Sequence, residues 1–236
     1  MQNNTSLCTI MKNCEDVLDT FFKWASQNFS EINIVVDPKN DDNTLRRVLY
    51  RSDYFNVKVH PFDDFSSQKQ RAYDMCTKPY AVLIDSDEIL EEIPENGIEN
   101  FMWRTNADVG VLPRYNFQGD DEHFLHYPDH QFRVIKVSSN VKMNGKPVDE
   151  RLNTTKDHML AILPWHILHY GHIREESALK LKGKDRIKFM NDDPCDGQPL
   201  LIHGEDWFIK RNELWNKEAL SVPKNITEYS RKYFNK

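Results

Sequence analysis

The sequence predicts an α/β fold with a mostly parallel sheet and helices on its faces, and three observations predict it. The chain of 236 residues is long enough to bury one sizeable core but short for two average domains. Its first half alternates short apolar runs with amphipathic stretches, as β-α-β units do. Residues 80–84 are apolar throughout, which is typical of a strand covered on both faces of a parallel sheet.

The elements of the first half follow one another in a regular order. Residues 15–29 carry apolar side chains three or four positions apart, which gives a helix one apolar face that can pack on the sheet. The loop at 37–43 is rich in turn-forming residues and separates the second strand from the next helix. The predicted strands are 6–11, 32–36, 57–59 and 80–84, and the predicted helices are 15–29, 44–50 and 66–77.

Beyond residue 105 the pattern is looser, with loops that contain proline and glycine. Three strands are predicted there, at 109–115, 131–137 and 162–170, followed by helices at 177–190 and 204–220. Residues 225–236 are polar, and we expect a frayed tail. No repeat divides the chain, so one domain over 1–236 is expected.

Composition excludes several classes of protein. The formal net charge is −6 and the basic residues form no cluster, so we expect no nucleic-acid binding. No run approaches the roughly 20 apolar residues of a transmembrane helix, and the first residues do not form a leader, so we expect a cytoplasmic protein. The four cysteines have no metal-type spacing and are expected to be free thiols.

Polar side chains follow three of the predicted strands at the point where each ends. Because parallel strands end at the same edge of a sheet, Asn13, Asp37 and Asp85 are expected to face one ligand site. Asp85 and Asp87 place two carboxylates there, which suits Mn²⁺ or Mg²⁺ shared with substrate phosphates. An acidic loop that binds nothing is the alternative interpretation of these two residues.

Four segments in this order resemble a known family. Residues 6–13 look like its opening strand and nucleotide loop, and 34–37 like its second strand with a base-contacting aspartate. Residues 64–77 and 83–88 look like the helix before the DxD strand and the DxD motif itself. Over about residues 6–175 the chain therefore resembles the family 2 glycosyltransferases with a GT-A fold: a Rossmann-like sheet with a smaller acceptor-side sheet and C-terminal helices.

The resemblance implies transfer of a sugar from a nucleoside diphosphate sugar, a UDP-sugar in the first instance, to an acceptor hydroxyl with inversion. It implies a donor half at 1–104, an acceptor half at 105–175 and a helical extension at 176–236. The acceptor, whether glycan, lipid-linked or protein, stays open. Donor contacts are expected from Thr9, Met11, Asn13, Asp37, Lys69, Asp85 and Ser86, and metal contacts from Asp85, Asp87, His169 and His172.

The chain departs from the family pattern at two places. Residues 38–44 stand where relatives carry a small pair followed by aspartate, and Lys69 and Gln70 stand where many carry an Arg-Asn pair. Lys69 still offers a cation to the ribose or the diphosphate. These departures leave the identity of the donor open.

An inverting transfer requires a general base for the acceptor hydroxyl. The segment 145–150 resembles the acidic base motif of relatives, which favours Glu150 or Asp149 as that base. Asp129, in a second stretch that resembles an acceptor-side motif, is the alternative. Arg133 offers a donor fork to a phosphate, or else forms an ion pair with Asp129.

Two other functions remain open at this level. A phosphohydrolase of the haloacid dehalogenase type also has Asp-x-Asp after an apolar strand and uses the first aspartate as nucleophile, but Ile89 stands where that class has Thr or Val. A non-catalytic nucleotide- or sugar-binding module on the same fold is the other alternative, because a fold does not determine a function.

Overall fold

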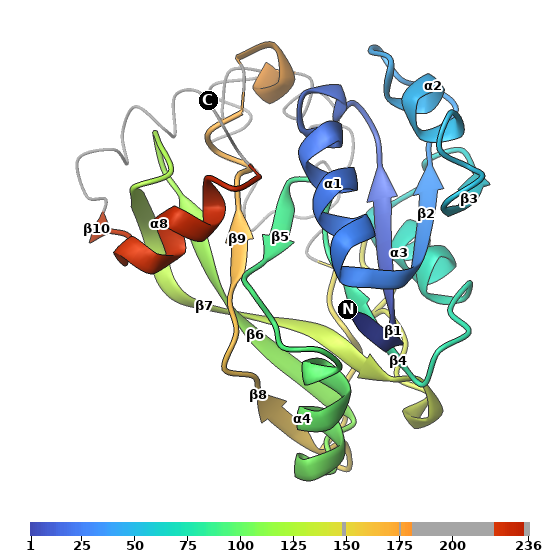
Figure 1. The fold of residues 1–236 in the computed structure, drawn as a ribbon. Coiled ribbons are helices and arrows are strands. Elements are labelled where there is room, and N and C mark those ends of the chain that lie inside the picture. The colour runs from blue at the N-terminus through green and yellow to red at the C-terminus, as the bar shows by residue number, and fades with distance from the viewer. Residues whose placement is uncertain (148–149, 175, 181–219, 234–236) are drawn as a thin grey trace.

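The structure is a computed structural model, and it describes residues 1–147, 150–174, 176–180 and 220–233. Ten strands in these ranges form one sheet in the order β3-β2-β1-β4-β7-β6-β9-β5, with β10 beside β7 and β8 beside β6 (Figure 1). The strands of the first half are β1 (Gln2–Met11), β2 (Phe29–Val36), β3 (Asn56–Val59), β4 (Tyr80–Leu83) and β5 (Glu88–Leu90). Those of the second half are β6 (Val109–Phe117), β7 (His123–Lys136), β8 (Leu160–Ile162), β9 (Ile167–His169) and β10 (Leu220–Ser221).

The four strands β3, β2, β1 and β4 run parallel, and helices cover both of their faces. Leu7 of β1 belongs to the core under α1, whereas its neighbour Cys8 belongs to the core that contains Ala72 of α3. This alternation is the period-two pattern of a strand buried on both faces. The helices of the first half are α1 (Leu18–Asn28) after a 3-10 turn at Glu15–Val17, α2 (Thr44–Leu49), α3 (Phe65–Tyr73) and α4 (Gly97–Thr105).

The strands of the second half continue the same sheet, because β7 pairs antiparallel with β4 and carries β6 on its other side. In β6 a bulge between Arg114 and Asn116 shifts its pairing with β7. β9 runs parallel to β6 and antiparallel to β5. The strands that the sequence predicted on the acceptor side are therefore part of the central sheet. One sheet thus holds the polar residues at the strand ends of both halves.

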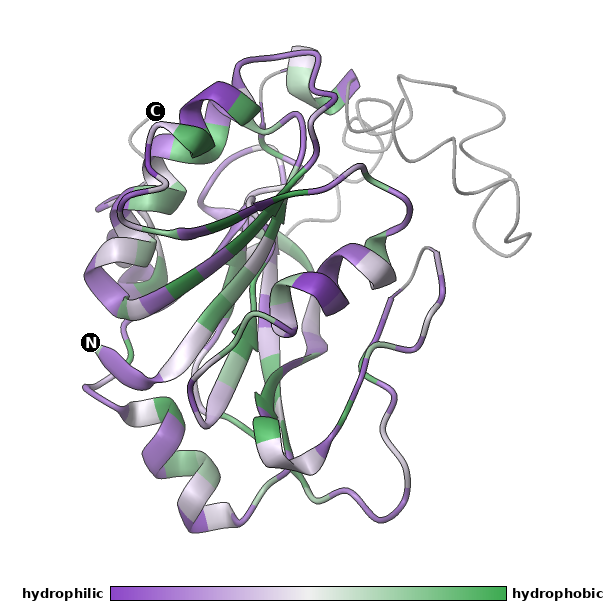
Figure 2. Ribbon diagram, turned by 90° about the vertical axis from the view of Figure 1, so that its right-hand side faces the viewer, coloured by the Kyte–Doolittle hydropathy of each residue, from purple (hydrophilic) through white to green (hydrophobic). Residues whose placement is uncertain are grey.

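The fold class predicted from the sequence is confirmed: the protein is an α/β protein with a mostly parallel central sheet flanked by helices. Hydrophobic residues run along the central strands and hydrophilic residues predominate on the outer turns and loops (Figure 2). The sequence did not predict β5 and α4. The predicted strand at 162–170 is two short strands, β8 and β9, and between them stands Pro164, which has no backbone N–H to donate to a neighbouring strand.

The expected frayed tail is wrong in part, since α8 (Lys224–Ser230) is a helix. Its Ile226 and Tyr229 pack into the main core, and the Ser230 hydroxyl accepts a hydrogen bond from Tyr170 Oη at 2.9 Å. Residues 176–180 are helical, while the rest of the predicted helix at 177–190 and nearly all of that at 204–220 lie outside the described residues.

Within the described ranges, no helix is both long and apolar enough to cross a membrane. Cys8, Cys14 and Cys76 are free thiols in the structure, and Cys195 lies outside the described residues.

Candidate active site

The loops after β1 and β2 are joined by hydrogen bonds at the edge of the sheet where these strands end. Asn13 adopts a left-handed conformation with φ of 48°, which Asn tolerates better than most residues. Its backbone N–H donates to Asn40 Oδ1 at 2.8 Å, and its Oδ1 accepts from the Asp41 N–H at 2.7 Å. Buried Asp37 lies 3.3 Å from the Lys12 ammonium. The predicted Asn13 and Asp37 thus lie in one loop assembly.

Three other predicted donor residues lie beside this assembly. The Thr9 side chain is buried, and so is that of Met11, which packs in the core. The backbone carbonyl of Met11 accepts the Asp37 N–H at 3.1 Å. Half-buried Ser86 lies against Cys14, and burial raises the pKa of that thiol to about 11. The side chains of Thr9 and Met11 are therefore almost entirely shielded from solvent, whereas Ser86 is half-buried.

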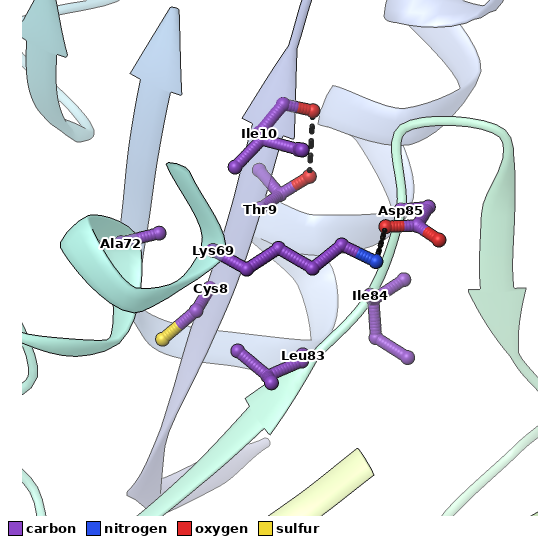
Figure 3. Close-up of a pocket in the computed structure, with 8 residues that line it drawn as sticks. All are labelled: Cys8, Thr9, Ile10, Lys69, Ala72, Leu83, Ile84 and Asp85. Atoms are coloured by element: carbon purple, nitrogen blue, oxygen red, sulfur yellow. Dashed lines mark hydrogen bonds and ion pairs between the residues drawn. The ribbon is translucent and has the colours of Figure 1, made fainter. Parts of the chain in front are cut away.

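Asp85 is held between two cations at the end of β4. Its Oδ1 lies 2.6 Å from Lys69 Nζ, as Figure 3 shows, and its Oδ2 lies 3.1 Å from Arg133 Nη2. Burial raises the pKa of Asp85, but Lys69 and Arg133 lower it further, so its pKa lies well below the usual range. Both oxygens of Asp85 are therefore occupied by ion pairs.

Lys69 extends from α3 across the small hollow drawn in Figure 3. Besides Asp85 it contacts Glu150, whose Oε1 lies 2.6 Å from its Nζ. Burial lowers the pKa of Lys69, but the two carboxylates raise it more, so the pKa is raised overall. The predicted base Glu150 and the first aspartate of the DxD motif thus share one buried ammonium. The hollow is lined by Cys8, Thr9, Ile10, Lys69, Ala72, Leu83, Ile84 and Asp85.

Glu88 organises the ion pairs behind the motif, and no sequence pattern selected it as a site residue. Its side chain is fully buried and its Oε2 accepts the Asp85 backbone N–H at 3.0 Å. Its Oε1 accepts from Arg114 Nη1 at 2.8 Å and Arg133 Nη2 at 3.1 Å. Arg133 therefore pairs with Asp85 and Glu88, and the expected pairing of Arg133 with Asp129 is wrong. Asp129 instead forms an ion pair with Arg114, which lies in the neighbouring strand β6.

Asp87 points to a different set of partners from Asp85. Its Oδ1 lies 3.7 Å from His169 Nε2, and its Oδ2 lies 4.0 Å from Arg174 Nη1. Arg174 donates to the Asn13 backbone carbonyl at 3.0 Å and pairs with Asp16 at 2.6 Å. Arg174 therefore connects the loop after β1 with the DxD motif. Its position two residues after the His-x-x-His run was the sequence signal for it.

The two predicted histidines lie together near Asp87. Their rings are 5.2 Å apart between centroids at 75°, and both side chains are largely buried. His169 faces Asp87, with the 3.7 Å separation given above between its Nε2 and Asp87 Oδ1. This distance makes His169 a candidate to share a cation with Asp87.

Asp129 is embedded in a hydrogen-bond cluster. Its Oδ2 accepts from Arg114 Nη2 at 2.6 Å and Asn116 Nδ2 at 2.9 Å, and its Oδ1 accepts from Gln131 at 2.7 Å. Burial raises the pKa of Asp129, but these partners lower it to a net value below the usual one. Such a carboxylate is a weak proton acceptor. Asp149, the other candidate base, lies outside the described residues.

The described residues contain no group of three or more His, Cys, Asp or Glu side chains arranged to hold a metal ion. Asp87 and His169 supply two such ligand atoms, 3.7 Å apart. Two protein ligands still fit Mg²⁺ or Mn²⁺, because such ions commonly take one or two protein groups and complete their shell with water and substrate phosphates. The residues present fit a cation that binds together with a diphosphate.

No family model and no curated protein matches the chain. Solved structures that it resembles include TarS of S. aureus, residues 1–349, in complex with UDP-GlcNAc: 13% identity, a TM-score of 0.46, and coverage of 88% of this chain and 79% of that one. TarS 1–349 matches with 11% identity, a TM-score of 0.45 and coverage of 98% and 87%, and another TarS structure with 14%, 0.46, 98% and 53%. At these values the likeness carries no inference about function, which we draw from the site alone.

Proposed function

We propose that the protein is a metal-dependent glycosyltransferase that moves a sugar from a nucleoside diphosphate sugar, a UDP-sugar in the first instance, to an acceptor hydroxyl. The observation that carries this proposal is the link through Arg174, which contacts both Asn13 in the first strand-end loop and Asp87 in the DxD motif. A diphosphate between these loops would meet a cation site on one side and a nucleotide-binding loop on the other.

We assign the residues to roles along this line. Asp87 and His169 would hold Mn²⁺ or Mg²⁺, with His172 as an alternative, and Asn13 and Asp37 would contact the nucleoside. When bound, the cation offsets negative charge on the departing nucleoside diphosphate. The buried Arg174 guanidinium supplies a fixed positive charge next to the same site. Lys69 and Arg133 hold Asp85 in place by ion pairs.

For the base we propose Glu150. Its carboxylate would accept the proton of the acceptor hydroxyl as the new bond to the anomeric carbon forms and the bond to the diphosphate oxygen breaks, which inverts that carbon. Its side chain is 16% exposed, so it is reachable, and it is joined to the DxD motif through Lys69. Asp129 is held by hydrogen-bond donors from three residues and is less suited to this role.

The phosphohydrolase alternative would need Asp85 as a nucleophile. Both oxygens of Asp85 are engaged by Lys69 and Arg133 at 2.6 and 3.1 Å, and a carboxylate that is ion-paired at both oxygens is a poor nucleophile. The geometry therefore supports transfer better than phosphate hydrolysis.

The first test is a thermal-shift screen of UDP, GDP and their sugars with and without Mn²⁺. We expect a nucleoside diphosphate to raise the melting temperature only when Mn²⁺ is present, because a ligand that binds the native state stabilises it. Asp87→Ala should abolish the dependence on Mn²⁺. Asp53→Asn, an exposed aspartate, is the matched control and should respond as the wild type does. An equal Mn²⁺ effect in the Asp87→Ala variant would refute the assignment of the metal site.

The second test separates the base from donor binding. Glu150→Gln should keep the thermal shift with donor and Mn²⁺ but lower the transfer rate by about 10²- to 10⁴-fold, the usual contribution of a general base. Transfer is measured as release of nucleoside diphosphate in the presence of candidate acceptors. Wild-type rates in this variant would exclude Glu150 as the base. A protein that binds the donor but releases no nucleoside diphosphate with any acceptor would support the non-catalytic module.

A further inference from the structure

Asn116 connects Asp129 with His169 by two hydrogen bonds. It lies in β6, directly opposite His169 in the parallel pairing of β6 with β9. Its Nδ2 donates to Asp129 Oδ2 at 2.9 Å, and its Oδ1 lies 2.8 Å from His169 Nδ1. The bulge of β6 between Arg114 and Asn116 shifts the pairing with β7 here.

The orientation of the Asn116 amide follows from Asp129. The ionised carboxylate can only accept hydrogen bonds, and its Oδ2 is already fixed by Arg114 Nε at 2.9 Å and Nη2 at 2.6 Å. The NH₂ group of Asn116 must therefore face Asp129, which leaves its carbonyl oxygen facing His169. An amide oxygen can only accept as well, so the hydrogen between the two residues is carried by His169 Nδ1.

A neutral imidazole carries one N–H, so a hydrogen on Nδ1 leaves a lone pair on Nε2. That Nε2 is the atom that lies 3.7 Å from Asp87 Oδ1. Metal–ligand bonds of about 2.0–2.2 Å place two ligand atoms of one ion roughly 3–4 Å apart. The lone pair of Nε2 and the Asp87 carboxylate therefore have the spacing that one cation can bridge.

We propose that Asn116, oriented by Asp129, is a positioning residue that keeps the Nε2 lone pair of His169 turned toward Asp87 and so sets the affinity of the site for a divalent cation. The part on cation affinity rests on the proposed function, whereas the part on the tautomer does not. Asp129 then acts through Asn116 and not as the general base, the role that the sequence suggested for it as an alternative to Glu150 and Asp149. Such partners of a metal-binding histidine typically contribute 10- to 100-fold to affinity.

The tautomer is tested in the metal-free protein. The ¹⁵N shifts of the His169 ring are measured above pH 8, and the signal is assigned among the nine histidines by its loss in His169→Gln. We expect a protonated Nδ1 and an unprotonated Nε2 in the wild type, and a mixture or a reversal in Asn116→Leu. A wild-type ring protonated on Nε2, or an unchanged ring in Asn116→Leu, would overturn the proposal.

Cation affinity is tested by titrating Mn²⁺ in the presence of the nucleoside diphosphate found by the screen. Asn116→Leu should weaken Mn²⁺ binding about 10- to 100-fold. Gln131→Leu is the matched control, because it removes another hydrogen bond to Asp129, of 2.7 Å, without touching His169. It should leave both the tautomer and the Mn²⁺ affinity unchanged, and equal losses in both variants would show a merely structural role for the cluster.

A reciprocal double variant keeps the test valid if Asn116→Leu folds poorly. In Asn116→Asp with Asp129→Asn, the new carboxylate can accept from His169 Nδ1 and the new amide can donate to it, so the Nδ1–H tautomer should return. Failure of this pair to restore the tautomer in a folded protein would also count against the proposal. If the wild type shows the expected tautomer but binds no Mn²⁺, the metal assignment of the proposed function fails and the cation part of this proposal fails with it, while the tautomer result stands.

Discussion

Glu88 is the single residue on which the ion pairs behind the DxD motif most depend. It is fully buried, and it accepts hydrogen bonds from Arg114, Arg133 and the Asp85 backbone. Removing one partner of a buried ion pair leaves the other charges unpaired away from water, which costs more than the pair itself contributed. Glu88 thus holds both the loop of the motif and the two arginines.

We expect Glu88→Gln to lower the free energy of unfolding by about 3–5 kcal/mol at pH 7, because the buried Arg133 and the half-buried Arg114 lose their shared carboxylate. Urea unfolding followed by circular dichroism measures this change. The matched control is Glu92→Gln, whose carboxylate is 78% exposed and lies 3.6 Å from Lys232. Exposed pairs contribute about 0–1 kcal/mol, so a similar loss in both variants would contradict the role given to Glu88.

At the residue scale, the sequence predicted where polar residues lie in the sheet when a local rule was enough. Asn13, Asp37 and Asp85 were found because they follow apolar strands, and the structure places them at one edge. The sequence did not indicate Glu88, Arg114 and Asn116. Their roles depend on pairing between the strands β5, β6 and β9, which are far apart in the sequence. The local sequence around a polar residue in a strand does not show whether its side chain is buried in an ion pair or exposed to solvent.

At the scale of elements, one buried carboxylate joins three strands. Glu31 in β2 accepts from Ser6 Oγ of β1 at 2.6 Å, and it also accepts from the backbone N–H of Thr77, at 2.9 Å, and from its hydroxyl, just before β4. Burial raises the pKa of Glu31, but the hydrogen bonds lower it to below its ordinary value of 4.5. The parallel strands are therefore tied together by an ionised group as well as by their ladders.

We expect Glu31→Gln to lower the free energy of unfolding by about 1.5–3 kcal/mol at pH 7, the range for hydrogen bonds to a charged group. Because the pKa is depressed in the folded state, this stabilisation is complete above the unfolded value of 4.5 and is lost as the pH falls through the lower folded value. Urea unfolding at several pH values should show the difference between wild type and variant shrinking below about pH 4. Glu228→Gln, 66% exposed, should show a small difference at every pH, and a constant gap for Glu31→Gln would contradict the assignment.

Elements were predicted well where apolar side chains form a clear pattern. β1, β2 and β4 contain apolar runs that are buried on both faces of the sheet, and α1 follows the period of a helix. β5 was missed because three residues are too few to show a period, and it forms by pairing with β9. α8 was missed because only Ile226 and Tyr229, three residues apart, mark its apolar side among polar neighbours.

At the scale of the whole molecule, the order of the strands in the sheet determines how the two halves meet. No local pattern in the sequence predicted this order. β7 joins the sheet beside β4, so strands of the first and second halves share one frame. The main core contains Leu7 of β1 together with Leu112 of β6 and Ile226 of α8. We propose from this continuity that residues 1–236 fold as a single domain.

Gly110 in β6 is a point where this shared core leaves no space. A Cβ at this position would lie 2.6 Å from Leu163 Cδ1, 2.8 Å from Val134 Cβ and 3.0 Å from Met102 Sδ. These neighbours belong to β7, α4 and the segment after β8, and the Val134 Cβ is attached directly to the backbone of β7, so it cannot move away by a change of rotamer. Interiors packed this closely transmit strain instead of absorbing it.

We expect Gly110→Ala to lower the free energy of unfolding by about 1–3 kcal/mol through overpacking. If the chain is one cooperative unit, the slowest-exchanging amides of both halves exchange only through global unfolding. The free energy of that opening should then fall by the same amount in both halves. Hydrogen exchange followed by mass spectrometry on peptides from β1 (Gln2–Met11) and β6 (Val109–Phe117) measures both at once. In the wild type the slowest amides of both peptides should report the same opening free energy, and in the variant both should fall by the same amount. A decrease confined to the β6 peptide would show that the halves unfold separately and would overturn the single-domain proposal.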